Sequence, residues 1–295
     1  MKVGFVGIGR MGMPMSKLLL EAGHAVYVNN RSQGKVEDMV TLGAVATSSI
    51  TEITQECEIV MACLPDVEAV ETIFLGDSGI INSAKPGQIL IDHSTVGINT
   101  TKKCYDNAKA KGVEFLDAPI SGGTERAING TLTIMCGGDK NTYETVLPLF
   151  EIMGATIHHV GPSGSGTAVK LVNQLLVGIH SVAAAEALIL GSKAGANPQQ
   201  IFEIVNSGWG QSFMLARNSE VMINRDFSGD RAQLRVILKD LKLINELSET
   251  LGSSTPLGDI ALERFLYAAE NGLDELDPAA IVMPLEEESN YKINE

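Results

Sequence analysis

The first dozen residues contain four glycines, and their placement limits the fold of the first half of the chain more than any other feature. The stretch VGFVGIGRMG, residues 3–12, carries Gly7, Gly9 and Gly12 in the spacing G-x-G-x-x-G. A glycine in a regular element costs about 0.5–1 kcal/mol relative to alanine, so we expect this cluster to form a turn. Apolar residues before it predict a short buried strand, and the residues after it have the spacing of a helix that ends at Gly23.

A strand, a glycine turn and a helix in this order are typical of a dinucleotide-binding unit. The first glycine allows the tight turn, the second lets the backbone approach a pyrophosphate, and the third lets the helix pack on the strand. The helix N-terminus adds N–H groups and a partial positive charge. An ordinary glycine turn is the alternative, but the strand AVYVNN after the helix favours a nucleotide site. The residues assigned to cofactor binding here are Gly7, Ile8, Gly9, Arg10, Met11 and Gly12.

The end of the second strand predicts which dinucleotide binds. NAD sites usually place an acidic residue there for the ribose 2′-hydroxyl, whereas NADP sites bring an arginine to the 2′-phosphate. The chain has Asn30, Arg31 and Ser32 at this place and no carboxylate. A guanidinium beside a hydroxyl suits a phosphate dianion. We therefore expect NADP, with NAD as the second choice, and a plain solvated turn is the alternative interpretation of these three residues.

The remainder of the first half alternates between strands and helices. Buried strands are predicted at CEIVMACLP, GQILIDHST, VEFLDAPIS and TLTIMCGG, and helices at VEAVETIF and TTKKCYDNAKAKG. This alternation predicts a doubly wound, mainly parallel sheet that binds its ligand at the carboxyl ends of the strands. Two such strand ends lie at residues 64–65 and 94–95, and we assign Leu64, Pro65 and Thr95 to the cofactor.

The sequence changes character after the glycines of residues 161–166. From Thr167 onward only helical patterns occur, beginning with a long one that ends near Ala194. The expected fold is an α/β Rossmann domain at residues 1–162, followed by an all-α domain at residues 163–295 and joined to it through the long helix. Two domains suit a chain of 295 residues. The last ten residues, EEESNYKINE, predict a loosely held tail.

Composition excludes several classes of function. The chain is 44% hydrophobic and 20% charged, as in soluble globular proteins, and its net charge of −14 opposes a general attraction to nucleic acid or anionic membranes. Its apolar stretches are interrupted short of a membrane span, and no secretion signal precedes Val3. We expect a cytoplasmic protein without a metal site, because no histidine has a partner at metal-ligand spacing. The four cysteines lack a CxxC pair and are expected in the core as free thiols: Cys57, Cys63, Cys104 and Cys136.

The long helix carries one isolated lysine. Between Lys170 and Glu186 there is no charged residue, and a helix that is apolar on nearly every face is buried. Burial lowers the pKa of a lysine and makes it a candidate acid or base near neutral pH, unless it reaches solvent from the first turns. Asn173 and Gln174 share its face. Such an apolar helix also predicts a contact with a second subunit, in a homodimer or homotetramer.

Four motifs, in this order, resemble those of the beta-hydroxyacid dehydrogenase family, which includes 3-hydroxyisobutyrate dehydrogenase, tartronate semialdehyde reductase and L-threonate dehydrogenase. They are GFVGIGRMGMPMS at the N-terminus, DAPISGG at 117–123, GSGTAVKLVNQ at 164–174 and KDL at 239–241. The resemblance extends from residue 3 to about 265. It implies a substrate carboxylate held by Ser121, Gly122 and Gly123, where a Ser-Gly-Gly turn can form an anion-binding nest. It also implies substrate contacts at Asn173 and Gln174, and a cofactor and substrate contact at Lys239.

The resemblance implies an NADP-preferring oxidoreductase that interconverts a short 3-hydroxy acid and its 3-oxo acid or semialdehyde, with Lys170 as general acid and base. An imine reductase on the same scaffold and a noncatalytic dinucleotide-binding or scaffold protein are the alternatives. Relatives of both kinds generally lack the lysine. The chain departs from the family at Ile98, where many members have proline, and at two aromatic residues: Phe213 is expected in the core, and the place of Trp209 is open.

Overall fold

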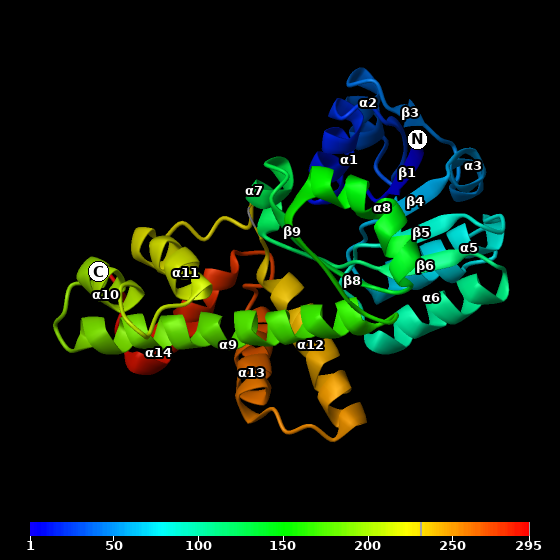
Figure 1. The fold of residues 1–295 in the computed structure, drawn as a ribbon. Coiled ribbons are helices and arrows are strands. Elements are labelled where there is room, and N and C mark those ends of the chain that lie inside the picture. Colours follow the sequence, from blue (N-terminus) through cyan, green and yellow to red (C-terminus); the bar gives the residue numbers. More distant parts are fainter. Residues whose placement is uncertain (231, 295) are drawn as a thin grey trace. The chain divides into compact units, whose positions relative to one another are not determined.

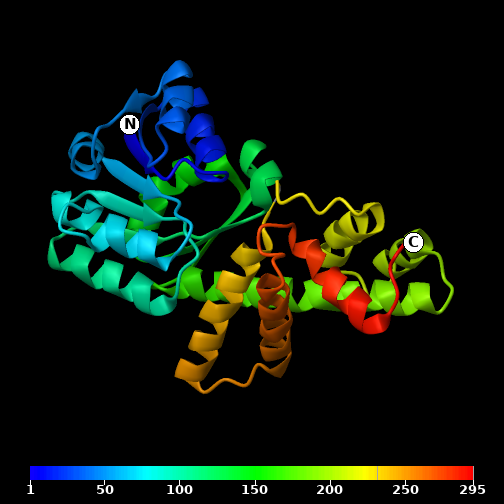
Figure 2. The same cartoon turned by 180° about the vertical axis from the view of Figure 1, so that it is seen from behind.

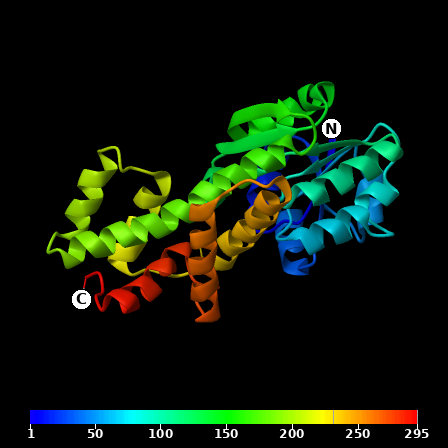
Figure 3. The ribbon, with the colours of Figure 1, turned by 90° about the horizontal axis from the view of Figure 1, so that it is seen from below.

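The computed structural model describes residues 1–230 and 232–294, and the chain forms two compact units, Met1–Lys170 and Leu171–Glu295. The division falls inside one long helix, α9 (Ser165–Lys193), which is drawn in green in Figure 1 and is continuous in Figure 3. The helix predicted from Thr167 to about Ala194 is therefore present. It begins at Ser165, so the glycine-rich stretch at residues 161–166 already contributes Gly166 to the helix.

A single sheet organises the first unit. Within the described residues, nine strands form this sheet in the order β3-β2-β1-β4-β5-β6-β8-β7, with β9 beside β8. All pairings from β3 to β6 are parallel, and the order reverses between β1 and β4, as in a doubly wound fold. The strands are β1 (Lys2–Val6), β2 (Ala25–Asn29), β3 (Val45–Ala46), β4 (Ile59–Ala62), β5 (Ile89–Asp92), β6 (Glu114–Asp117), β7 (Ile120–Ser121), β8 (Leu132–Gly137) and β9 (Gly154–Gly161).

Helices cover both faces of this sheet (Figure 2). Because alternate side chains of a strand point to opposite faces, Phe5 of β1 enters one hydrophobic cluster and Val6 enters the other. The helices whose residues complete the Phe5 cluster are α1 (Gly12–Glu21), α2 (Gln33–Thr41), α7 (Gly123–Ile128) and α8 (Lys140–Met153). Those of the Val6 cluster are α3 (Ile50–Glu56), α4 (Val67–Val70) with the π-helical turn η1 (Glu71–Leu75), α5 (Ile80–Ser83) and α6 (Ile98–Ala110). Burial on both faces explains the continuous apolar runs that predicted the strands.

The cysteines behave as core residues. None of the four cysteines forms a disulfide, three of them are buried, and Cys63 is partly buried. Burial raises the pKa of the thiols of Cys57 and Cys104 to about 12, which keeps them protonated and unreactive at neutral pH.

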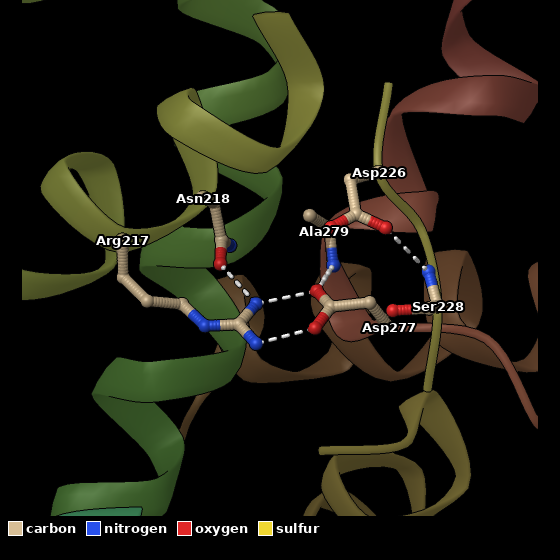
Figure 4. Close-up of polar contacts among 6 residues, drawn as sticks. All are labelled: Arg217, Asn218, Asp226, Ser228, Asp277 and Ala279. Carbon is tan, nitrogen blue, oxygen red and sulfur yellow. Dashed lines mark hydrogen bonds and ion pairs between the residues drawn. The ribbon is translucent and has the colours of Figure 1, made fainter. Parts of the chain in front are cut away.

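The second unit is helical in its described residues, as the sequence predicts. After the remainder of α9 come α10 (Pro198–Asn206), α11 (Phe213–Asn224), α12 (Leu234–Leu251), α13 (Pro256–Glu270), η2 (Pro278–Ile281) and α14 (Val282–Ser289). Helices α12 and α13 lie side by side (Figures 2 and 3). Figure 4 shows Arg217 of α11 donating to both carboxylate oxygens of Asp277, which also accepts the N–H of Ala279 at 2.9 Å. This ion pair, in which Asp277 is buried, joins α11 to the residue directly before η2.

Two expectations for the second unit are wrong. The predicted tail is not loose over its described residues, 286–294: Glu286 is buried, accepts from Arg225 Nη1 at 2.6 Å and from the N–H of Ile293 at 2.9 Å, and Ile293 itself is fully buried. Its last residue, Glu295, lies outside the described residues. Phe213 is not a core residue: it is 70% exposed at the first turn of α11, where Met214 and Leu215 occupy the buried positions. Trp209 is fully exposed.

The sequence analysis expected no segment long and apolar enough to cross a membrane, and helix α9 does not meet that expectation. By length and composition it qualifies, and it is the one such helix within the described residues. A single helix of this kind is weak evidence for a membrane span, because the core helices of soluble proteins have the same length and composition.

Candidate active site

The glycine turn between β1 and α1 has the geometry that its spacing predicts. Gly7 adopts a φ of +84°, and an added Cβ would lie 2.5 Å from the carbonyl oxygen of Cys63. A Cβ at Gly12 would overlap the carbonyl oxygen of Gly7, whereas one at Gly9 would meet nothing within 4 Å. The first and third glycines are thus enclosed by backbone and the second faces open space. This arrangement leaves the room beside the helix N-terminus that a pyrophosphate requires.

Apart from Lys239, which lies on α12 of the second unit, the other residues assigned to the cofactor lie at the same edge of the sheet as this turn. Asn30–Ser32 follow β2, Leu64 and Pro65 follow β4, and Thr95 follows β5. Since β2, β1, β4 and β5 are parallel neighbours, their carboxyl ends meet at one edge. The structure therefore brings these residues together around the point where the strand order reverses.

Ser94 fixes the loop after β4 and was not assigned this role from the sequence. Its Oγ accepts the N–H of Leu64 at 2.9 Å, and its own N–H donates to Asp92 Oδ1 at 2.9 Å. The hydroxyl is therefore engaged in positioning Leu64. No periodicity could reveal this contact, because the two residues are 30 positions apart.

Arg31 and Ser32 are exposed to solvent where β2 ends. Asn30 Nδ2 donates to the carbonyl oxygen of Ser32 at 3.2 Å, which holds the turn that leads into α2. Among these three side chains, none is acidic. The turn thus presents a cation and a hydroxyl to solvent at the strand end.

The Ser-Gly-Gly loop extends beyond this edge of the sheet. Strands β6 and β7 pair with β8 in one continuous register, with Asp117 opposite Gly137 and Ser121 opposite Thr133. Gly122 and Gly123 follow with φ values of +136° and +69°, and helix α7 (Gly123–Ile128) begins there. Such a turn can direct successive N–H groups to one side, as an anion requires.

His93 lies next to this loop but has the properties of a core histidine. It is fully buried against Phe5 and Phe150, and burial lowers its pKa to about 4. The imidazole is therefore neutral at physiological pH, and its Nδ1 donates to the carbonyl oxygen of Ala118 at 2.7 Å in the tautomer that this contact favours. Among the described residues, no group of three or more His, Cys, Asp or Glu side chains could hold a metal ion.

Lys170 lies on α9 and is only 7% exposed. It is the last residue of the first unit, and Asn173 follows it by one turn on the same helix face. The uncharged stretch after it was the sequence signal for burial, and burial of the lysine is confirmed.

A chain of polar contacts joins the other assigned residues of the second unit. Asn173 Nδ2 donates to Gln174 Oε1 at 2.9 Å, and Gln174 Nε2 donates in turn to Asp240 Oδ2. The other oxygen of Asp240 pairs with Lys239 Nζ at 2.9 Å. Asp240, which is 2% exposed, therefore connects residues that the sequence analysis assigned separately. The KDL motif contained this residue, but its role depends on a partner 66 positions away.

Comparisons with known proteins match both halves of the chain to dehydrogenases. Two family models match the chain: the NAD binding domain of 6-phosphogluconate dehydrogenase over residues 2–161, and the NAD-binding region of NADP-dependent 3-hydroxyisobutyrate dehydrogenase over residues 164–285. The 2-hydroxy-3-oxopropionate reductase of Escherichia coli (strain K12) is 36% identical over 294 residues, which cover 99% of this chain and 100% of the relative.

Solved structures are similar along almost the whole chain. The 3-hydroxyisobutyrate dehydrogenase of Mycobacterium tuberculosis, determined with L-serine, has a TM-score of 0.88 and 29% identity, covering 96% of this chain and 98% of that one. The protein Psf3, determined in complex with NADP+ and 2-OPP, has a TM-score of 0.88 and 27% identity, covering 96% of this chain and 99% of that one.

Proposed function

This chain belongs to the beta-hydroxyacid dehydrogenase family, and on that premise we propose that it is an NADP-preferring enzyme that interconverts a short 3-hydroxy acid and its 3-oxo acid or semialdehyde. Membership makes it an NAD(P)-dependent hydroxyacid dehydrogenase. The proposal adds the substrate class, the preference for NADP, the residue that moves the proton and a cytoplasmic location. It is carried by the burial of Lys170 on α9, one turn before Asn173.

Each assigned residue has a distinct part in the proposed reaction. The backbone of Gly7–Gly12 holds the pyrophosphate, Arg31 and Ser32 hold the 2′-phosphate, and residues of the β4 and β5 ends complete the cofactor site. When bound, the nicotinamide exchanges a hydride with the carbinol carbon of the substrate. Ser121 and the N–H groups of Gly122 and Gly123 hold the substrate carboxylate.

Lys170 moves the proton that accompanies this exchange. As a neutral amine it accepts the hydroxyl proton during oxidation, and as an ammonium it donates to the developing alkoxide during reduction. Asn173 contacts the substrate and is oriented by Gln174 through the contact at 2.9 Å. Lys239 contacts cofactor and substrate, with its ammonium oriented by the buried Asp240 at 2.9 Å.

An activity screen tests this function against its alternatives. The purified enzyme is assayed with NADPH and NADH, and with their oxidised forms, on short 3-hydroxy acids, small semialdehydes and cyclic imines. We expect turnover of one of the acids or semialdehydes. Turnover of imines alone would favour the imine reductase, and binding of NADPH without any turnover would favour the noncatalytic protein.

Replacing Arg31 by alanine tests the cofactor preference. We expect Arg31→Ala to weaken NADPH binding about 10- to 100-fold, because a charge-assisted hydrogen bond worth about 1.5–3 kcal/mol is lost. NADH lacks the 2′-phosphate, so its affinity should change little. Fluorescence titration of both reduced cofactors measures the two dissociation constants.

Lys35 provides the matched control, because it is an exposed cation in the first turn of α2, close to Arg31 in the sequence. Lys35→Ala should leave the ratio of the two affinities unchanged. Equal weakening of NADPH and NADH by Arg31→Ala, or a wild-type kcat/KM that favours NADH, would show that the assignment is wrong.

The exposed side of α9 supports the proposed homodimer or homotetramer. Val172, Leu176 and Leu190 on this helix are 59%, 48% and 75% exposed, and apolar side chains in such a row favour a protein partner. Sedimentation velocity at micromolar concentration should show a dimer or tetramer. A single species of 31.4 kDa would contradict the prediction.

A pair of variants locates this contact. Leu176→Glu should shift the protein toward the monomer, whereas Leu257→Glu, at an exposed leucine of α13, should not. Dissociation by both variants, or by Leu257→Glu alone, would place the contact elsewhere.

A further inference from the structure

We propose that Asp117 is a positioning residue that anchors the start of α9, and with it Lys170, to the strand that leads into the substrate loop. This inference rests on the proposed function for the role of Lys170. Its geometry lies entirely within the first unit, Met1–Lys170.

The carboxylate of Asp117 binds the first turn of α9 directly. Oδ1 accepts the N–H of Gly164 at 2.8 Å, and Oδ2 accepts the N–H of Thr167 at 2.9 Å and its hydroxyl at 3.3 Å. The first N–H groups of a helix have no partner inside the helix, and the residue just before the helix usually supplies one. In α9 the acceptor instead comes from β6, about 50 residues earlier in the chain.

The carboxylate of Asp117 is tightly enclosed by its neighbours, among them Gly137 and Gly166. Asp117 is 2% exposed, and a Cβ added at Gly137 would lie 2.7 Å from its Oδ1. A Cβ added at Gly166 would lie 3.0 Å from its Oδ2. The hydroxyl of Thr167 also contacts that of Thr101 on α6 at 2.9 Å. The start of α9 is therefore fixed to both β6 and α6.

The hydrogen bonds favour the ionised carboxylate, although burial raises the pKa of Asp117. All the neighbours that contact its oxygens are donors, and the bonds from Gly164 and Thr167 oppose the effect of burial. An ionised carboxylate has only acceptors and matches this set. The side-chain amide of an asparagine at this position would point its own N–H group at the backbone N–H of either Gly164 or Thr167.

Asp117 also belongs to the segment that carries the substrate loop. Ala118, the next residue, is held on both sides: its N–H donates to the carbonyl oxygen of Asp92 at 2.8 Å, and its own carbonyl oxygen contacts His93 Nδ1 at 2.7 Å. Ser121 follows in the same register along β8. In the other direction, Lys170 lies three residues after Thr167, or about 4.5 Å along the helix.

The carboxylate of Asp117 thus connects the proton-transfer lysine with the loop proposed to hold the substrate carboxylate. A displacement of a catalytic group by about 1 Å can cost about 100-fold in rate. We therefore assign to Asp117 the task of setting the distance between these two parts of the site.

Asp117→Asn tests the inference, because asparagine has nearly the same volume but loses the charge and one acceptor. We expect kcat to fall about 10- to 100-fold through misplacement of Lys170. The affinity for NADPH should change less than about twofold, because the cofactor residues lie at other strand ends. Steady-state kinetics and fluorescence titration separate the two effects, both measured well below the Tm of each variant.

Asp139 is the matched control. Its Oδ1 accepts the N–H of Thr142 at 2.9 Å at the start of α8, so it also binds the first turn of a helix, but it is exposed and lies directly before the helix that it caps. Asp139→Asn should leave kcat within about twofold of wild type. A fall in kcat of similar size in both variants would overturn the positioning role, because a general loss of stability would explain it.

Hydrogen exchange gives a readout that does not depend on turnover. Backbone amides of residues 164–170 should exchange faster in Asp117→Asn and at the wild-type rate in Asp139→Asn. Unchanged exchange in Asp117→Asn would overturn the inference. If Asp117→Asn does not fold, Thr167→Val replaces it: loss of the hydroxyl contacts should lower kcat severalfold at unchanged NADPH affinity, and a wild-type kcat would overturn the inference.

The same measurements separate this inference from the proposed function. If wild-type enzyme turns over none of the short 3-hydroxy acids or semialdehydes, the proposed function fails and the exchange experiment still decides the role of Asp117. If wild type is active and Asp117→Asn is equally active, the inference fails and the function stands.

Discussion

Lys170→Ala is expected to lower kcat by about 10²- to 10⁴-fold, the usual contribution of general acid–base catalysis. The buried ammonium or amine is proposed to exchange the proton with the substrate hydroxyl, and alanine cannot do so. NADPH affinity, measured by fluorescence titration, should change little, because the phosphates are proposed to be held by the glycine turn and Arg31. Turnover at a near-normal rate in Lys170→Ala would refute the acid–base role.

Two further variants exclude indirect effects. Lys170→Met keeps most of the buried volume but has no titratable group. Alanine at this position leaves a cavity that can destabilise the protein, whereas methionine does not. An equal loss of kcat in both variants would therefore come from the missing amine. Lys193→Ala removes the cation in the last turn of the same helix and should leave kcat near the wild-type value. Loss of activity in all three variants would indicate damage to α9 itself.

The pH dependence of the wild-type enzyme gives a separate test of the same residue. Oxidation needs the neutral amine, so kcat/KM for oxidation should rise with pH and level off above the apparent pKa of Lys170. A profile without this rise, or one that persists unchanged in Lys170→Met, would contradict the assignment.

The second large effect is expected at Gly9. Gly9→Val should weaken NADPH binding at least about 100-fold, since a branched side chain would fill the space that the pyrophosphate needs and remove charge-assisted contacts worth about 1.5–3 kcal/mol each. Its Tm should change little, because a Cβ at Gly9 meets nothing within 4 Å. Fluorescence titration and thermal unfolding measure the two quantities.

Gly12 provides the contrasting position in the same turn. A Cβ there would overlap the carbonyl oxygen of Gly7 and crowd the ring of Phe5, so Gly12→Ala should lower the Tm strongly as well as the affinity. If Gly9→Val binds NADPH as tightly as wild type, the cofactor does not approach this turn and the proposed site is wrong.

The glycine turn and the central strands of the first unit could be predicted because their signals are local. Strands buried on both faces are continuous apolar runs, as in Ile59–Ala62, and the glycine spacing marks a turn within a few residues. The long uncharged stretch after Lys170 likewise predicted burial of that residue, and its exposure of 7% confirms it. In each case the residues that carry the signal adjoin one another in the chain.

Features that depend on distant partners could not be predicted. The antiparallel pairing of β8 with β6 and β7 follows from a chain reversal that no periodicity records. Asp117 and Asp240 resemble ordinary acidic residues in the sequence, and their partners lie about 50 and 66 positions away. The polar C-terminus appeared loose for the same reason. The partner of Glu286 is Arg225, which lies 61 positions earlier, directly after α11.

The most direct test of the account follows deuterium in a single turnover. Wild-type enzyme is mixed with NADPH that carries deuterium at the transferable position of C4 and with short 3-oxo acids and semialdehydes, and the products are analysed by mass spectrometry. We predict that one of these substrates is reduced to its 3-hydroxy acid with deuterium on the carbinol carbon, and that Lys170→Met binds the labelled cofactor but forms this product about 10²- to 10⁴-fold more slowly. Binding of the labelled cofactor by the wild-type enzyme without deuterium in any hydroxy-acid product would contradict the account.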